Sequence, residues 1–192
     1  MIIGVDVDGV LTKLEKYQLV EGERYFKIPP VNKKGYKIYQ IFGLTLEDDR
    51  RFWHDNIFSY ATYDTVQVGS AEVLKKLKAD GHTVIIVTAR TFTREDSPRG
   101  EKMRKIMNDW LSDNDVVYDK IVYSEEDKTE ICKRLNLDVM IEDCVDNILN
   151  VSKSIPVICM DAIYNKEAQG NNIFRAYGWK DVYPIVCKLI KR

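Results

Sequence analysis

Two aspartates stand close together at the end of an apolar run near the start of the chain. Asp6 follows the residues Ile-Ile-Gly-Val, and Val7 separates it from Asp8, which precedes Gly9. The run predicts a short strand of a parallel sheet, buried on both faces. Residues i and i+2 of a strand share a face, so both carboxylates can address one ligand. Neighbouring carboxylates repel each other unless a cation or a proton lies between them, so the pair predicts a divalent metal site or acid–base chemistry. The alternative is a strand that ends in two solvated aspartates and a turn glycine.

Particular polar residues also follow three later apolar runs. Thr88, Ala89 and Arg90 close the second run, Lys128 comes shortly after the third, and Asp143 follows the fourth. The carboxyl ends of parallel strands lie along one edge of a sheet, so these side chains are expected to converge with the aspartate pair. A nucleophile, a cation and fixed hydrogen-bond donors are what phosphoryl transfer requires. The set therefore predicts an enzyme of phosphoryl transfer.

Strands and helices alternate from about residue 66 onward. Strands are expected at 83–87, 121–123, 139–141 and 156–160, and helices at 70–80, 97–111, 127–135, around 148–151 and at 181–190. The helix that begins at Ser97-Pro98 has proline at its favoured first position and a core-facing apolar stripe. The alternation predicts an α/β fold, a Rossmann-like and mostly parallel sheet covered by helices on both faces.

Residues 13–65 do not follow this alternation. Two short strands are expected within 17–28, joined as a hairpin at Glu21-Gly22, and another strand within 36–42. Thr45 is the expected N-cap of a helix that runs to about residue 60, with Asp48 in the position of a capping box. We therefore expect a core made of residues 1–12 and 66–192, with 13–65 inserted as a cap.

Composition limits the kinds of partner that the protein can have. The 192 residues carry a net charge of −1 and are 45% hydrophobic, an ordinary globular profile without the basic excess that suggests a nucleic-acid polymer. No apolar run approaches the roughly 20 residues that span a bilayer, so we expect a cytoplasmic protein without membrane contact. The four cysteines form no Cys-x-x-Cys pair and are expected to be buried, reduced thiols: Cys132, Cys144, Cys159 and Cys187. Whether the chain forms a homo-oligomer is left open.

Four motifs resemble, in order, those of the haloacid dehalogenase (HAD) superfamily of phosphohydrolases. They are Asp6-x-Asp8-Gly9-Val, Ile-Ile-Val-Thr88-Ala89-Arg90, the isolated Lys128, and Ile-Glu142-Asp143 with the Asp146-Asn147 pair behind it. The resemblance covers essentially the whole chain. It includes the second aspartate, which the members that attack carbon lack, and so points to the phosphatases.

The resemblance implies a role for each of these residues. Asp6 would be the nucleophile and Asp8 the general acid and then the base, while Lys128 would offset charge on Asp6 and on the phosphate. Asp6, Asp143 and the backbone carbonyl of Asp8 would hold Mg²⁺, whose preferred ligands are hard oxygens. The substrate phosphate would be bound by the remaining motif residues: Gly9, Thr88, Ala89 and Arg90. The roles of Glu142, Asp146 and Asn147 are left open.

A finer resemblance connects the chain with the 5′(3′)-deoxyribonucleotidase-like branch and its bacterial nucleotidases. It rests on Phe52-Trp53, the Val-Thr-Ala-Arg motif, Tyr164-Asn165 and Arg175-x-x-x-Trp179. It implies a small phosphorylated substrate, first of all a (deoxy)nucleoside monophosphate. A sugar phosphate is the alternative within the same chemistry, and a phospho-acceptor or catalytically silent binding module is the alternative of another class. The cap aromatics can stack a base, although most are expected to form the cap's own core.

Overall fold

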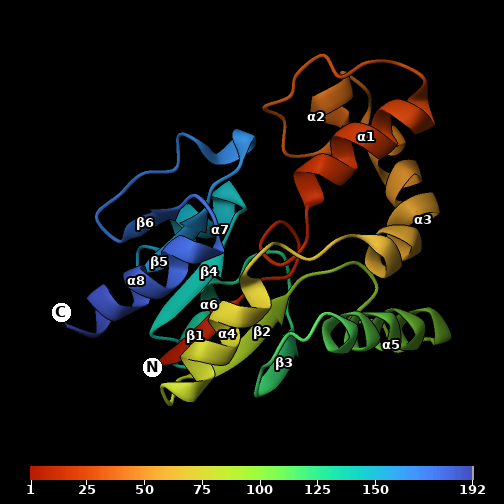
Figure 1. Cartoon of the computed structure of the whole chain (residues 1–192). Coiled ribbons are helices and arrows are strands. Elements are labelled where there is room, and N and C mark those ends of the chain that lie inside the picture. Colours follow the sequence, from red (N-terminus) through yellow and green to blue (C-terminus); the bar gives the residue numbers. More distant parts are fainter. Residues whose placement is uncertain (192) are drawn as a thin grey trace.

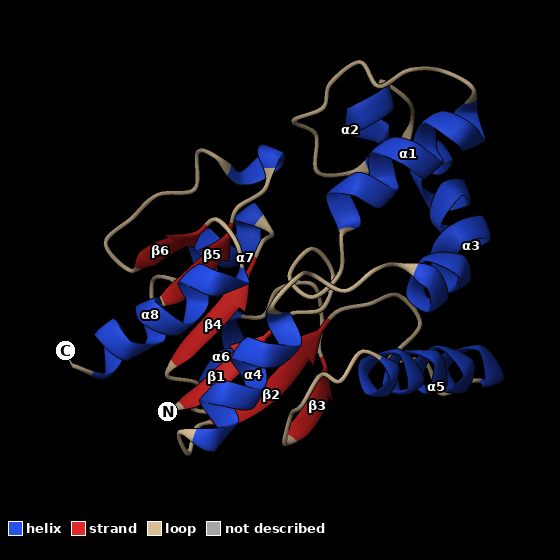
Figure 2. Cartoon of the chain, viewed as in Figure 1, coloured by secondary structure: helices blue, strands red, loops and turns tan. Residues whose placement is uncertain are grey.

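A six-stranded sheet forms the centre of the computed structural model, which describes residues 1–191 (Figures 1 and 2). The strands are β1 (Ile2–Val5), β2 (Thr83–Thr88), β3 (Lys120–Tyr123), β4 (Val139–Glu142), β5 (Val157–Met160) and β6 (Ile173–Ala176). Their order is β3-β2-β1-β4-β5-β6 and all five pairings are parallel, so the predicted α/β fold is confirmed. β6 was not predicted, because a four-residue edge strand that is mostly half-buried lacks a continuous apolar run.

Helices cover both faces of the sheet, because alternate strand residues point to opposite sides. On one face Ile3, Val5 and Ile86 pack against the helices α4 (Ser70–Ala79), α5 (Pro98–Asp113) and α8 (Trp179–Ile190). On the other face Val87 and Met140 pack against α6 (Thr129–Arg134) and α7 (Val145–Val151). Ser97 caps α5 by accepting a hydrogen bond from the Gly100 N–H, with Pro98 at the first helical position, as predicted.

Residues 13–65 are entirely helical where they are regular, so the expected strands are wrong. The segment forms α1 (Leu14–Phe26), α2 (Ile38–Phe42) and α3 (Leu46–Tyr63). The buried face of α1 consists of Leu14, Gln18 and Gly22, and two of these three are not apolar, so the helical period does not show in a hydrophobicity pattern. Gly22 is there because a β-carbon would lie 2.3 Å from the ring of Phe42.

The helix expected after Thr45 is confirmed. The Thr45 hydroxyl accepts a hydrogen bond from the Asp48 N–H, and the Asp48 carboxylate accepts one from the Thr45 N–H, which is a capping box. The two chain segments that connect 13–65 to the sheet lie side by side, joined by the Thr12–Val66 bridge and a 2.7 Å hydrogen bond from Gln67 N to Leu11 O. We interpret residues 13–65 as an inserted cap, because in Figure 1 its helices lie beyond the carboxyl ends of the strands.

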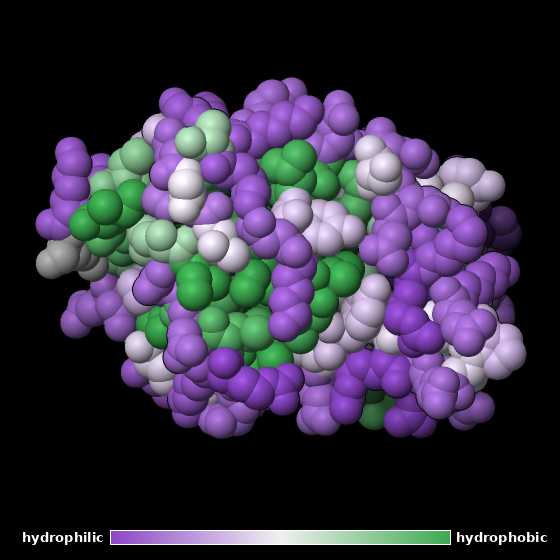
Figure 3. Space-filling view, turned by 90° about the horizontal axis from the view of Figure 1, so that it is seen from below, coloured by the Kyte–Doolittle hydropathy of each residue, from purple (hydrophilic) through white to green (hydrophobic). Residues whose placement is uncertain are grey.

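The side of the molecule away from the cap carries an apolar area on its surface. Figure 3 views the molecule from that side and shows apolar residues gathered between polar borders. Within residues 1–191, no helix has both the length and the apolar character needed to cross a bilayer. All four cysteines are free thiols. Cys132 and Cys159 are buried as expected, whereas Cys144 and Cys187 are only half-buried.

Candidate active site

Asp6 directly follows β1 in the sequence and lies at the centre of the sheet edge that faces the cap. Its N–H donates to the Ile141 carbonyl of β4 at 3.1 Å, which continues the strand pairing and leaves the side chain buried. Asp6 Oδ1 is 2.6 Å from Lys128 Nζ, and the same ammonium is 2.9 Å from Glu142 Oε2. Lys128 therefore bridges the ends of β1 and β4, although it follows β3 in sequence.

Burial and charge perturb both ends of this bridge. Burial raises the pKa of Asp6 to about 8, against the opposing effect of Lys128. Burial by itself would lower the pKa of Lys128, but the carboxylates of Asp6 and Glu142 outweigh it and raise that pKa above its ordinary value. Lys128 is thus a permanent cation, held among more acidic groups than it can neutralise.

Glu142 and Asn147, whose roles the sequence left open, support Lys128. Glu142 Oε1 accepts hydrogen bonds from Cys144 N at 3.2 Å and from Asn147 Nδ2 at 3.3 Å. Asn147 Oδ1 in turn accepts the N–H of Lys128 at 3.2 Å. Asp146, by contrast, is exposed on α7. The extra methylene of Glu142 relative to aspartate lets one carboxylate reach both the ammonium and the start of α7.

Asp143 is completely buried beside this bridge. Its Oδ2 accepts a hydrogen bond from the Tyr164 hydroxyl, whereas Oδ1 is buried without a hydrogen-bond partner among residues 1–191. Gly9, at φ +78°, lies so close that a β-carbon there would stand 1.9 Å from Asp143 Oδ2. Burial, with Glu142 and Asp6 adding to it, raises the pKa of Asp143 well above its ordinary value.

The carboxylate cluster fits a divalent cation. Asp6, Glu142 and Asp143 each offer an oxygen within 4.8 Å of the others. With all three carboxylates ionised, one ammonium leaves two negative charges unbalanced. The raised pKa values of Asp6 and Asp143 reflect this buried excess, which a bound cation would offset. The unpartnered Oδ1 of Asp143 is a free oxygen ligand of the type that Mg²⁺ prefers.

Asp8 is not a member of that cluster and pairs with Arg90. Arg90 Nη2 is 2.5 Å and Arg90 Nε 3.1 Å from Asp8 Oδ1. The guanidinium is buried and lies 5.1 Å from the ring of Tyr60, whose hydroxyl bonds Thr12 Oγ1 at 2.6 Å. The resemblance assigned Arg90 to the substrate phosphate, but here its nearest anion is Asp8. Its Nη1 is buried without a hydrogen-bond partner in the described part of the chain.

Thr88 and Ala89 lie at the end of β2, next to β1. Thr88 is buried and its hydroxyl accepts the Arg90 N–H at 3.2 Å. Beyond them the loops 89–95 and 124–127 line an open cavity of about 430 Å³. The fold therefore brings the predicted residues of all four strand ends to one edge, with the side chain of Asp8 paired with Arg90.

Several cap aromatics pack against one another. Phe42 and Phe52 are buried, and the ring of Tyr17 stacks on that of Trp53 at 6.3 Å. Tyr36 is different, because its ring packs at 5.0 Å against Tyr164 of the core. Sequence reasoning noted Tyr164 only through the resemblance and did not place it on Asp143. The sequence signal that could have indicated this contact is the position of Tyr164, a tyrosine four residues after the apolar strand that ends at Met160.

Comparison with known proteins supports a nucleotidase relationship. Residues 1–191 match the family described as 5′ nucleotidase, deoxy (Pyrimidine), cytosolic type C protein. A nucleotidase of Clostridium acetobutylicum is 27% identical, over 99% of this chain and 95% of the relative.

Solved structures agree on the fold. A predicted phosphatase of Clostridium acetobutylicum superposes with a TM-score of 0.65 at 16% identity, covering 97% of this chain and 98% of the other. A HAD-superfamily hydrolase of Ehrlichia chaffeensis gives 0.57 at 13% identity, covering 98% and 97%. With the family match over nearly every residue, the chain belongs to the cytosolic type C 5′-deoxynucleotidase family, among the phosphatases of the HAD superfamily.

Proposed function

We propose that the protein is a Mg²⁺-dependent phosphomonoesterase that works through an aspartyl phosphate on Asp6. The observation that carries the proposal is the buried cluster of Asp6, Glu142 and Asp143 around Lys128, with Thr88 on the neighbouring strand. Asp6, Asp143 and the backbone carbonyl of Asp8 would hold the metal ion. When bound, Mg²⁺ offsets charge on the phosphate oxygens.

The first step forms a bond between a carboxylate oxygen of Asp6 and phosphorus, and breaks the bond from phosphorus to the ester oxygen. Lys128 stabilises the charge on the equatorial oxygens, and the Thr88 hydroxyl donates a hydrogen bond to one of them. Asp8 gives its proton to the leaving alkoxide. Because Asp8 pairs with Arg90, that salt bridge has to open before Asp8 can carry a proton.

The second step is hydrolysis of the aspartyl phosphate. Asp8, now a carboxylate, takes a proton from water, and the water oxygen attacks phosphorus while the bond to Asp6 breaks. Phosphate leaves and both aspartates return to their starting forms. Dividing the reaction in this way replaces one difficult displacement by two easier ones.

The substrate that we propose is a nucleoside or deoxynucleoside monophosphate. The family description and the name of the relative from Clostridium acetobutylicum both support it. The open cavity of about 430 Å³ lies next to the site rather than on it: Ala89 and Arg90 line it, whereas Asp6, Lys128 and Asp143 do not. Its volume is in the range of small-molecule sites. A sugar phosphate is the second candidate, because mostly polar residues line that cavity. The expected cytoplasmic location stays a prediction.

Phosphate release from a panel of nucleoside monophosphates and sugar phosphates, with Mg²⁺ and with EDTA, tests the proposal. Asp6→Asn should lower turnover by about 10⁴-fold or more, since the nucleophile is removed. Asp138→Asn is the matched control, because Asp138 lies at the opposite edge of the sheet, where its side chain accepts the Ile2 N–H. Acid-quenched wild-type enzyme should carry a phosphoryl group that hydroxylamine releases.

The outcomes separate the alternatives. Selective release from nucleotides supports both the chemistry and the substrate, whereas release mainly from sugar phosphates keeps the chemistry alone. Turnover that survives Asp6→Asn refutes the mechanism. If no compound on the panel is hydrolysed, the binding-module alternative is favoured.

A further inference from the structure

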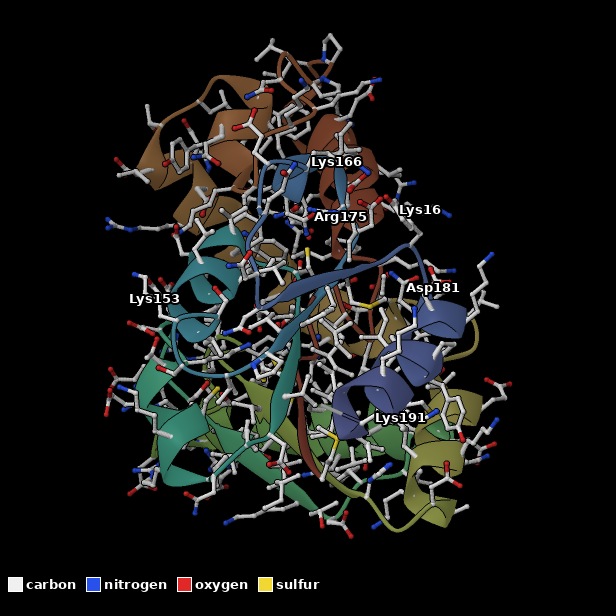
Figure 4. All side chains as sticks on the ribbon, turned by 90° about the vertical axis from the view of Figure 1, so that its left-hand side faces the viewer. Lys16, Lys153, Lys166, Arg175, Asp181 and Lys191 are labelled. Atoms are coloured by element: carbon white, nitrogen blue, oxygen red, sulfur yellow. The ribbon has the colours of Figure 1, made fainter. Side chains whose placement is uncertain are left out.

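The loop that follows β5 is held in place by the hydrogen bonds of Asn165. Asn165 is buried and its amide donates to the carbonyls of Asp143 and Met160, both at 2.8 Å. Its Oδ1 accepts Arg175 Nη1 at 2.9 Å, and Arg175 also pairs with Asp161 at 2.9 Å. Figure 4 shows Arg175 and Lys166 close together at the cap end of the sheet. The short 3₁₀ helix Ile163–Asn165 is therefore fixed against the backbone of Asp143.

Tyr164 is the residue that this anchored turn presents to the site. Its hydroxyl donates to Asp143 Oδ2. The other oxygen of the same carboxylate is the buried one without a partner among the described residues. A hydrogen bond to one oxygen restricts rotation of a carboxylate and so decides where the free oxygen points.

The cap contacts the same turn at two positions. Glu15 Oε2 of α1 accepts the Ile163 N–H at 2.8 Å, and the ring of Tyr36 packs edge-on against the ring of Tyr164. One short turn thus contacts the cap on one side and Asp143 on the other. A displacement of the cap changes the surroundings of Tyr164 and, through its hydroxyl, of Asp143.

We propose that Tyr164 is a positioning residue that orients Asp143 for Mg²⁺ and makes metal binding depend on the position of the cap. The inference rests on the proposed function, because Asp143 is a metal ligand only there. Tyr164 touches neither the phosphate nor the nucleophile in this proposal. Its effect is exerted through the carboxylate that it bonds.

Calorimetric titration of the full chain with MgCl₂, without substrate, tests the proposal. Tyr164→Phe keeps the ring against Tyr36 and removes only the hydroxyl, so Mg²⁺ binding should weaken by about 10- to 100-fold. Tyr183→Phe is the control, because the Tyr183 hydroxyl also donates a hydrogen bond to an aspartate, Asp80, at 2.7 Å. Asp80 lies between α4 and β2, at the amino ends of the strands and away from the site. Both variants lose one phenol–carboxylate hydrogen bond. The Tyr183 bond is exposed and the Asp143 carboxylate is buried, so Tyr164→Phe should lower the thermal stability without metal more than Tyr183→Phe does. Mg²⁺ affinity should fall only in Tyr164→Phe.

A second variant tests the contribution of the cap. Tyr36→Ala keeps the Tyr164 hydroxyl and removes the ring that supports it, so Mg²⁺ binding should weaken by about two- to tenfold, the range that an aromatic pair can supply. Unchanged affinity in Tyr36→Ala overturns the dependence on the cap.

Asp143→Asn distinguishes a failure of the positioning role of Tyr164 from a failure of the proposed function. If Asp143→Asn abolishes Mg²⁺ binding while Tyr164→Phe binds Mg²⁺ as well as the wild type or better, the positioning role is overturned and the proposed function stands. If the wild-type chain binds no Mg²⁺, both are overturned.

Discussion

Gly9→Ala isolates the close approach between the first and fourth motifs. A real β-carbon keeps at least 3.0 Å from other heavy atoms, but here it would lie 1.9 Å from Asp143 Oδ2 and 2.5 Å from Asp143 Cγ. The carboxylate must therefore move by about 1.1 Å. A non-glycine residue at φ +78° costs about 1–2 kcal/mol in addition.

Gly81→Ala provides the matched control. Gly81 has nearly the same backbone angle, φ +83°, but nothing lies within 4 Å of the position of its β-carbon. Both variants should lose about 1–2 kcal/mol of unfolding free energy from the backbone. Gly9→Ala should lose about 1–3 kcal/mol more, because displacing Asp143 breaks its bond with Tyr164 and leaves buried polar groups unpaired.

Three assays measure the difference between these two variants. Urea unfolding gives the stabilities, calorimetry gives the Mg²⁺ affinities, and phosphate release gives turnover. A displacement of about 1 Å in a catalytic constellation costs about 100-fold in rate, so Gly9→Ala should lose about that much turnover and Gly81→Ala none. Turnover and Mg²⁺ affinity of Gly9→Ala equal to those of Gly81→Ala would refute the claim that this contact positions Asp143, the proposed metal ligand.

Further predictions concern charge and burial. Lys128→Met should lower the unfolding free energy by about 3–5 kcal/mol, because Asp6 and Glu142 lose the cation between them; equal urea midpoints would contradict the bridge. Burial raises the pKa of Cys132 to about 12 and that of Cys159 to about 11. Little thiolate therefore exists at pH 8.5, and alkylation of both cysteines by iodoacetamide, followed by mass spectrometry, should be much slower than that of a free thiol. Rates that are already those of a free thiol at pH 8.5 would show that the side chains are accessible.

The elements that could be predicted are those whose signal is local. The strands that precede Asp6, Thr88 and Asp143 are short runs of β-branched and apolar residues, because a parallel strand buried on both faces has no polar side. The start of α3 was predictable from Thr45 and Asp48, whose side chains bond the neighbouring backbone. In these cases the physical cause lies within a few residues of the effect.

The first two cap helices, α1 and α2, could not be predicted, because their packing decides their conformation. Gln18 and Gly22 lie on the buried face of α1, where Gln18 donates to the Tyr36 carbonyl at 3.0 Å and Gly22 admits the ring of Phe42. Neither residue marks a helix by its own preference. The helical face exists only once α2 lies against it.

By itself, the sequence determined which residues lie at the carboxyl ends of the strands and hence which chemistry is available. Order along the chain and a buried strand before each residue are enough for that. Tertiary structure alone decided that Lys128 reaches Asp6 and Glu142, that Asp8 turns to Arg90, and that Tyr164 bonds Asp143. These contacts join residues that are 14 to 122 positions apart in the sequence. Each contact depends on the distance between two side chains, and the packing of whole strands and loops sets that distance. A local sequence pattern carries no information about it.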